Sequence, residues 1–260
     1  MTTTVPAAFD LTGHVALVTG SSSDLGIGFA AARLLGQLGA SVMVTGTTDR
    51  VGERASELQR EGIAAGSHVA DLMDPGAAQG LVAATEAEFG KVDIVVNNAG
   101  LASVNIPERP NPLMSMTEEE WSLALRRNVD SAFFVTRAAL PGMVHRGYGR
   151  IVNVGSSAGV LTAYTGDVGY HTAKAAMLGM TRSVAVDVAG NGVTANIVLP
   201  GWIATAAQLP SEVPLGDATP VGRSASAAEV ATGIAFLAAP GASYVTGTTL
   251  VIDGGNSISS

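Results

Sequence analysis

The regular alternation of short apolar segments with longer helical ones is the feature that most constrains how this chain can fold. Apolar runs predict strands at 15–19, 41–45, a stretch ending at 68–70, 92–96, 150–154, 193–199 and 248–252. Helical patterns separate them at 29–38, 49–61, 75–89, 117 to about 145, 168–188 and 227–238. Because apolar strands that alternate with helices belong to parallel sheets, we predict an α/β fold. The expected architecture is a doubly wound parallel sheet of about seven strands, with helices on both faces.

Composition limits the number of domains and the classes of partner. The chain has 260 residues, 47% of them hydrophobic, with no internal repeat or linker-like stretch, so we predict one domain over 1–260. The net charge of −8 argues against a nucleic-acid partner, because neutralising phosphates requires clustered Lys and Arg. The sequence contains no Cys, which excludes disulfides and thiolate chemistry, and we predict no metal site.

The hydropathy pattern does not indicate a membrane protein. No apolar run approaches the roughly 18 residues that a transmembrane helix needs. Residues 1–10 lack the basic region followed by an apolar core that marks a secretory signal. We therefore predict a cytoplasmic protein without membrane association.

A glycine-rich segment, Thr-Gly-Ser-Ser-Ser-Asp-Leu-Gly-Ile-Gly, covers residues 19–28 between the first predicted strand and the first predicted helix. Glycines in such a turn let the backbone approach a pyrophosphate, and the N-terminus of the following helix favours anions. An ordinary turn is the alternative. In its strand–turn–helix context the segment predicts a Rossmann-like dinucleotide site, although five residues rather than three separate Gly20 from Gly26.

The end of the second predicted strand bears on the choice of cofactor. NAD-selective folds usually place an acidic residue there to bind the ribose hydroxyl, but this chain has Gly46 and Thr47. These residues and Thr48 leave room for a 2′-phosphate, with Arg50 within reach, so we predict that NADP(H) is favoured over NAD(H). Asp49 is the counter-evidence, because it lies close enough to turn toward the ribose.

Tyr170 and Lys174 stand four residues apart in a segment that predicts a helix. Side chains at positions i and i+4 lie on one face of a helix, so a phenol and an ammonium are expected side by side. A free tyrosine has a pKa of about 10, and a neighbouring cation lowers that pKa because it favours the phenolate. The pair therefore predicts a tyrosine that can give a proton to a forming alkoxide or take one from an alcohol. By itself, the same spacing also arises in accidental surface pairs.

From about residue 13 to residue 256, the chain resembles the short-chain dehydrogenase/reductase family. The resemblance rests on motifs in a fixed order: the Gly-rich loop, Asp71, Asn97-Asn-Ala-Gly100, Asn128, Asn153-Val-Gly-Ser-Ser-Ala-Gly159, Tyr170 with Lys174, Pro200-Gly-Trp-Ile-Ala-Thr205 and Asp253-Gly-Gly255. It implies reversible hydride transfer between a nicotinamide and a small-molecule ketone or secondary alcohol. In such enzymes the cofactor carries the hydride, and the protein orients the reacting groups and stabilises the charge that develops on them.

The resemblance also implies roles for individual residues. Tyr170 is the general acid/base, and Lys174 lowers its pKa and binds the nicotinamide ribose. Ser156 polarises the substrate carbonyl, and Asn128 holds a water in a proton relay toward Lys174. Asp71 accepts a hydrogen bond from the adenine amino group.

Ser157 is the alternative to Ser156. Ser156 precedes Gly159 by three residues, as the catalytic serine does in the family, but it lies 14 residues before Tyr170 where 13 is usual. Ser157 restores the second spacing and breaks the first. We prefer Ser156 with a one-residue insertion within 161–169.

The cofactor contacts implied by the resemblance follow the ends of several predicted strands. They are Gly20, Ser22, Ser23, Leu25, Gly26, Ile27, Thr47, Thr48, Asp71, Leu72, Asn98, Ala99, Gly100, Tyr170, Lys174, Pro200, Gly201, Ile203 and Thr205. Asn97 is expected to line the cofactor together with Gly100.

Two irregular stretches, 101–115 and 202–224, follow predicted strands and contain three prolines each. Because open α/β sheets bind ligands at such strand ends, we predict that 202–224 forms a lid over the substrate. The pocket is expected to use 101–112, 160–167 and 202–219.

The apolar residues in these segments predict a pocket that tolerates aromatic groups: Val160, Leu161, Tyr164, Trp202 and Leu209. Asp167 is expected to cap the helix that carries Tyr170. Attraction of a substrate amine is its weaker alternative role.

A 3-oxoacyl-acyl-carrier-protein reductase is the alternative activity, because it shares every motif above. Its acidic carrier protein requires a basic docking patch. In this acidic chain Arg126, Arg127 and Arg137 are the residues that could form one, so we favour a free small molecule.

Two further alternatives come from the same motifs. The glycine spacing resembles divergent enoyl-acyl-carrier-protein reductases, but those enzymes separate Tyr from Lys by six residues, not three. A non-catalytic nucleotide-binding protein is also conceivable, because fold alone does not prove activity. The resemblance implies a homotetramer formed through the helices that carry Asn128 and Tyr170 and through the C-terminal strand.

Overall fold

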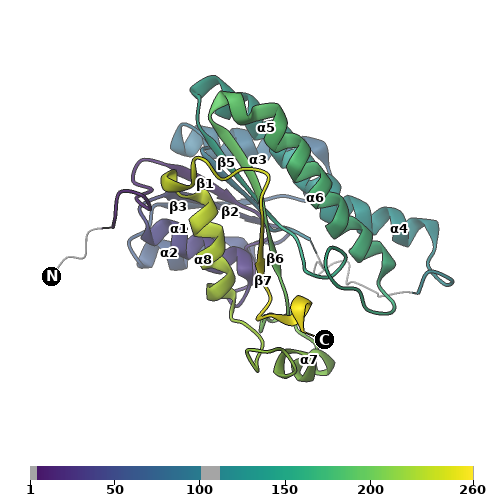
Figure 1. The fold of residues 1–260 in the computed structure, drawn as a ribbon. Coiled ribbons are helices and arrows are strands. Elements are labelled where there is room, and N and C mark those ends of the chain that lie inside the picture. Colours follow the sequence, from purple (N-terminus) through teal and green to yellow (C-terminus); the bar gives the residue numbers. More distant parts are fainter. Residues whose placement is uncertain (1–4, 101–111, 260) are drawn as a thin grey trace.

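In a computed structural model of the chain, residues 5–100 and 112–259 are described. Seven parallel strands form one sheet in the order β3-β2-β1-β4-β5-β6-β7 (Figure 1). They are β1 Val15–Val18, β2 Ser41–Gly46, β3 Ala65–Val69, β4 Ile94–Asn97, β5 Gly149–Val154, β6 Val193–Pro200 and β7 Thr249–Ile252. The predicted doubly wound parallel sheet is confirmed.

Helices cover both faces of this sheet (Figure 1). Their bounds are α1 Ile27–Gln37, α2 Arg50–Arg60, α3 Pro75–Phe89, α4 Glu118–Leu125, α5 Ser131–Arg146, α6 Val168–Val188, α7 Val213–Asp217 and α8 Ala227–Ala238. Strand side chains alternate between the faces: Val18 packs in a core with α1, α2 and α8, whereas Leu17 packs with α3, α5 and α6. Strands buried on both sides explain why their sequences are uniformly apolar.

The long helix predicted from residue 117 to about 145 is not regular throughout. Thr117 and Glu120 form the expected capping box at the start of α4. A π-helical turn, Arg126–Asp130, then separates α4 from α5. Such turns insert one extra residue into a helix and often occur at functional sites. The helical sequence pattern did not reveal this turn.

The strand order reverses at β1, which lies between β2 and β4. In open α/β sheets, ligands bind beyond the carboxyl ends of the strands at such a reversal. The predicted irregular stretch 101–115 follows β4 here, and its residues 101–111 lie outside the described residues. In the described part of the chain, no helix is long and apolar enough to cross a membrane.

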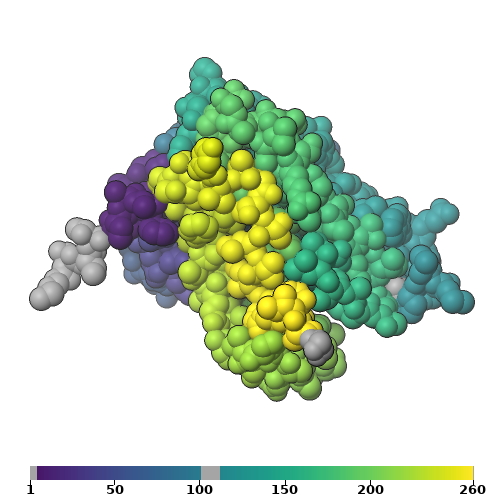
Figure 2. Space-filling view, in the orientation of Figure 1, coloured from purple at the N-terminus to yellow at the C-terminus, as the bar shows by residue number. Residues whose placement is uncertain are grey.

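The lid predicted at 202–224 follows β6 and contains structure of its own. A 3₁₀ turn, Pro210–Glu212, leads into the short helix α7. Segment 202–224 lies against the C-terminal segment, where Val221 N donates to Gly254 O at 3.2 Å. Figure 2 shows this contact region at the surface, with the yellow-green lid beside the yellow C-terminus.

Candidate active site

A cavity of about 520 Å³ opens beyond the carboxyl ends of the central strands. Its lining includes Gly20 after β1, Thr47 after β2, Asn98 after β4, Ser156 after β5 and Gly201 after β6. Cavities of this size are typical of cofactor and small-molecule sites. One cavity therefore brings together segments that lie far apart in the sequence.

The loop after β1 is fastened to the end of β4 by the side chains of Thr19 and Asn98. Asn98 Nδ2 donates to the carbonyls of Thr19 and Gly20, at 3.0 Å each. Thr19 Oγ1 accepts the backbone N–H groups of Asn98 at 3.0 Å and Ala99 at 2.9 Å. These bonds fix the glycine-rich loop before any ligand binds, because they satisfy the polar groups on both sides of the junction.

Glycines make this close approach possible. Gly20 has φ +68°, and a Cβ there would lie 2.8 Å from Ala99 Cα. A Cβ at Gly28 would lie 2.6 Å from Gly20 O. Gly26 is the N-cap of α1 and makes no side-chain cap bond, so the first turn of α1 meets the cavity with its N–H groups available to an anion.

Beyond β2, the cavity wall carries the hydroxyls of Thr47 and Thr48 and the guanidinium of Arg50. Thr48 Oγ1 is buried and has no hydrogen-bond partner in the described part of the chain. Asp71 Oδ1 accepts the N–H of Met73 at 3.0 Å, and Asp71 also lines the cavity. The glycine cradle, the helix N-terminus and this unpaired hydroxyl fit a phosphorylated dinucleotide.

Tyr170 and Lys174 project from the first turns of α6 into the same cavity. Lys174 is 4% exposed, and its Nζ lies 5.5 Å from the centroid of the Tyr170 ring. Lys174 Nζ also donates to Val154 O, at the end of β5, at 3.0 Å. That bond ties the ammonium to the sheet and fixes it beside the phenol.

Asn128 lies beneath the cavity and does not line it. Asn128 is fully buried in the π-helical turn, and its Nδ2 donates to Ala124 O at 3.0 Å. A Cβ on Gly100 would lie 2.6 Å from Asn128 Oδ1 and 3.5 Å from Lys174 Nζ. Asn128 and Lys174 therefore approach the same glycine, and the π-helical turn carries the amide to that point.

Both candidate serines line the cavity. Ser156 Oγ accepts the N–H of Ala158 at 3.1 Å, which orients its side chain. Ser157 is engaged through its backbone: its N–H donates to Pro200 O at 2.9 Å, and its carbonyl accepts N–H groups from the turn that follows. These contacts give Ser157 a part in shaping the turn between β5 and α6.

A buried network of short polar side chains joins β4, β5, α5 and α6 behind the cavity. Asn97 Nδ2 donates to Thr136 Oγ1 at 2.9 Å and to Asn153 Oδ1 at 2.8 Å. Asn153 Nδ2 in turn donates to Thr181 Oγ1 at 2.7 Å. Asn97 is therefore part of the support for α6, and it lies outside the cavity lining where we expected it.

Of the residues predicted to contact the cofactor, all but Leu25 and Asn97 line the cavity. Leu25 is 58% exposed. Gln208 and Glu212 line the cavity within the expected stretch 202–219, although neither was singled out, whereas sequence reasoning missed Asn256. It also treated Arg127 as a surface residue. Arg127 is 9% exposed and faces the cavity, so it does not join a docking patch with Arg126 and Arg137.

On the substrate side, Tyr164 and Trp202 line the cavity as expected. Val160 and Leu161 instead border a separate shallow depression. Leu209 is 54% exposed and lies outside both linings.

Asp167 occupies the N-cap position of α6, as expected. It is 7% exposed and does not line the cavity. Burial raises the pKa of Asp167, and His171, the N–H of Tyr170 and the Tyr164 hydroxyl act in the opposite direction. Asp167 therefore lies at the expected position, and its carboxylate interacts both with the first turn of α6 and with the side chains of Tyr164 and His171.

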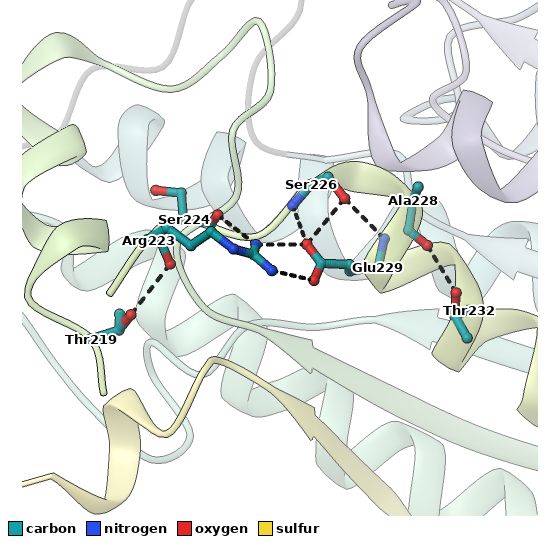
Figure 3. Close-up of polar contacts among 7 residues, drawn as sticks. All are labelled: Thr219, Arg223, Ser224, Ser226, Ala228, Glu229 and Thr232. Atoms are coloured by element: carbon teal, nitrogen blue, oxygen red, sulfur yellow. Dashed lines mark hydrogen bonds and ion pairs between the residues drawn. The ribbon is translucent and has the colours of Figure 1, made fainter. Parts of the chain in front are cut away.

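The lid is tied to α8 by an ion pair with two contacts (Figure 3). Arg223 Nη2 and Nη1 contact the two carboxylate oxygens of Glu229 at 2.7 and 2.9 Å. Glu229 also closes a capping box with Ser226 at the start of α8. Because Arg223 and Ser226 both donate to it, the pKa of Glu229 is lowered to about 2.

Comparisons with known proteins agree with this geometry. A family model described as enoyl-(acyl carrier protein) reductase matches residues 20–257. The chain belongs to the short-chain dehydrogenase/reductase family, and it is an oxidoreductase of that family. The spacing of three residues between Tyr170 and Lys174 still differs from that of the divergent enoyl reductases.

Individual relatives cover nearly the whole chain. The 3-oxoacyl-(acyl-carrier-protein) reductase FabG of Vibrio cholerae is 41% identical over 251 residues, which is 95% of this chain and 98% of that protein. FabG of Escherichia coli K12 is 36% identical over 247 residues, or 94% and 97%. A crystal structure of a proposed gluconate dehydrogenase from Agrobacterium tumefaciens matches 98% of this chain and 100% of its own, with TM-score 0.90 and 32% identity.

Proposed function

We propose that this short-chain dehydrogenase/reductase is an NADP(H)-dependent carbonyl reductase or alcohol dehydrogenase that acts on a small-molecule ketone or secondary alcohol. The observation that carries the proposal is the Tyr170 phenol in the cavity with the Lys174 ammonium fixed beside it. A cation held next to a phenol favours the phenolate, which is the form that can accept a proton from an alcohol.

The cofactor site uses the loop after β1 and the hydroxyl-rich end of β2. The N-terminus of α1, at Gly26 and Ile27, receives the pyrophosphate. Thr48 and Arg50 bind the 2′-phosphate, and the unpaired Thr48 hydroxyl supports this preference over NAD(H). The bound nicotinamide supplies or accepts the hydride.

The protein moves the proton. In the reductive direction Tyr170 donates its hydroxyl proton to the oxygen of the substrate as that oxygen becomes an alkoxide. Ser156 donates a hydrogen bond to the same oxygen and stabilises its developing charge. Asn128 and Lys174 continue the path along which Tyr170 regains a proton, and their approach to Gly100 supports that order.

A second candidate is 3-oxoacyl-(acyl-carrier-protein) reductase. The observation that favours it is the 41% identity with FabG of Vibrio cholerae over nearly the full length. Against it stands the acidic chain, in which Arg127 faces the cavity and is withdrawn from any docking surface. Initial rates with an acetoacetyl-carrier-protein substrate and with simple ketones distinguish the two candidates.

A cofactor-coupled assay with Tyr170→Phe tests the main proposal. Wild type is expected to oxidise NADPH with a ketone, and the variant to lose about 10²–10⁴-fold of that rate while still binding NADPH. Turnover within a few-fold of wild type would show that Tyr170 is not the acid/base. The matched control is Tyr148→Phe, which removes the buried hydroxyl of a tyrosine that lies outside the cavity lining.

The proposed enzyme is one catalytic domain, with 202–224 as its lid, that works in the cytoplasm as a homotetramer. Exposed apolar side chains on α5, α6 and β7 support such an assembly: Phe133 is 43% exposed, Val186 is 81% exposed and Val251 is 40% exposed. Light scattering of the purified protein measures the assembly. The proposal includes no nucleic-acid or membrane partner.

A further inference from the structure

Two aromatic rings stand on the wall of the cavity that holds Tyr170. Tyr164 comes from the segment between β5 and α6, and Trp202 follows β6. Their ring centroids lie 6.1 Å apart with an interplanar angle of 33°. Aromatic rings attract other flat apolar groups in offset or edge-on contacts at centroid distances of about 4.5–7 Å. The two rings therefore present aromatic surface to a flat group in the cavity that Tyr170 also lines.

Tyr164 also contacts two residues at the start of α6. The ring of His171 meets the Tyr164 ring edge-on, with centroids 4.3 Å apart and an interplanar angle of 81°. The Tyr164 hydroxyl bonds to the carboxylate of Asp167, which stands one helical turn before His171. Both supporting residues come from the start of α6, the helix that carries Tyr170, so the ring is fixed relative to the catalytic phenol.

This support is needed because the Tyr164 ring is 42% exposed on an irregular segment. An exposed aromatic side chain without partners samples several rotamers, and a ligand that selects one of them loses affinity. Asp167 is itself buried, and a buried carboxylate is costly unless it is hydrogen-bonded. Three groups favour the charged form of Asp167: His171, the backbone N–H of Tyr170 and the Tyr164 hydroxyl. Asp167 is thus connected to the same side chains that hold the Tyr164 ring.

The described residues of the lid contribute no basic side chain to the cavity lining. Among the described lid residues that line the cavity, Gln208 and Glu212 are the polar ones with long side chains. Arg223 is the basic residue of the lid, and it is engaged with Glu229 outside the lining. A carboxylate or phosphate on the substrate would thus find Glu212 there, and like charges repel.

We propose that Tyr164 and Trp202 form an aromatic clamp that selects ketones and secondary alcohols with an uncharged flat ring beside the reacting carbon. Asp167 and His171 are positioning residues that hold Tyr164 in the clamp. The reaction at the carbonyl rests on the proposed function above, whereas the clamp rests on the geometry of these four side chains.

Binding tests the clamp without turnover. In the protein saturated with NADPH, an alcohol forms a complex that cannot react, so calorimetry measures its dissociation constant directly. Wild type is expected to bind 1-phenylethanol about 3- to 10-fold more tightly than 1-cyclohexylethanol, because the two ligands differ chiefly in the flatness of the ring. Tyr164→Leu should bring this ratio close to one, and Asp167→Asn should lower it. Phe9→Leu, the same kind of change at an exposed aromatic residue outside the lining, should leave it unchanged.

A ratio near one in wild type, an unchanged ratio in Tyr164→Leu, or no measurable binding of either alcohol would overturn the clamp. Because both ligands are compared in the same variant, a loss of folded protein lowers both signals and does not move the ratio. Turnover of acetophenone and cyclohexyl methyl ketone is then measured separately. Selective binding of the alcohols without turnover of either ketone would contradict the proposed function but not the clamp. Turnover of both ketones without selective binding would contradict the clamp but not the proposed function.

Discussion

The floor of the cavity and its rim are built in different ways. The floor lies at the strand ends, where Thr19, Asn98 and a set of glycines lock the backbone through buried hydrogen bonds. The rim consists of segment 202–224 and the segment around Tyr164, where side-chain contacts add to scattered backbone bonds: the Arg223–Glu229 ion pair and the Asp167–His171–Tyr164 cluster. The floor is thus fixed by the geometry of the sheet, whereas the rim relies more on individual side-chain contacts.

This difference predicts where substitutions will act. Changes in the floor should abolish chemistry or cofactor binding, because its atoms have no room to move. Changes in the rim should shift selectivity and pH dependence while the reaction survives. The following predictions test that division, from the largest expected effect to the smallest.

Ser156→Ala is expected to reduce kcat by about 10²–10³-fold, because it removes a donor to the developing oxyanion. Ser157→Ala is the matched control, since the contacts described for Ser157 are made by its backbone. Steady-state rates with one ketone and saturating NADPH measure both. A larger loss in Ser157→Ala would reverse the assignment of the two serines.

Gly28→Ala tests the floor at the cofactor loop. A Cβ there meets the carbonyls of Gly20 and Thr19 at 2.6 and 3.0 Å, and such overpacking costs about 1–3 kcal/mol. NADPH titration should show weaker binding, and urea unfolding should show lower stability. Gly52→Ala, in α2 where the nearest atom is 3.9 Å away, should instead gain up to about 1 kcal/mol from helix propensity. Equal effects of the two changes would refute the tight fit at Gly28.

Asp167→Asn tests the rim through pH. Burial raises the pKa of Asp167 above its ordinary value of 3.8, so the folded state favours the protonated carboxyl. The stability that this group contributes is present below that ordinary value and is lost as the pH rises through the raised one. Because asparagine does not ionise, the variant should gain unfolding free energy relative to wild type between pH 4 and pH 7. Urea titrations at several pH values check this, and a difference that does not vary with pH would contradict it.

Glu229→Gln tests the ion pair between the lid and α8, and we expect the smallest effect on stability here because the pair is exposed. The pKa of Glu229 is lowered to about 2, so its contribution is present above the ordinary value of 4.5 and lost as the pH falls toward about 2. Thermal unfolding should show a less stable variant at pH 7 and a shrinking difference below pH 4.5. The same difference at pH 7 in 1 M salt would contradict an electrostatic origin, because salt screens exposed pairs.

The two parts of the site also differed in how far the sequence predicted them. The cofactor residues sit at strand ends and in glycine turns, both of which follow from local pattern, and nearly all of them line the cavity. Leu25 is the exception in this loop, because its side chain is exposed and lies outside the cavity lining. Glu212 and Gln208 belong to no local pattern, since the fold of the lid carries them to the cavity.

The sequence by itself determined the sheet, its helices and the group of residues that meet at the strand ends, because apolar periodicity and glycine placement act over short distances. The tertiary structure decided how those residues are used. The π-helical turn at Arg126–Asp130 carries Asn128 under Gly100 and turns Arg127 into the cavity. Packing around α6 placed the carboxylate of Asp167, the N-cap residue, beside Tyr164 and His171 as well. Such outcomes depend on which distant groups are buried together, and no local pattern records that.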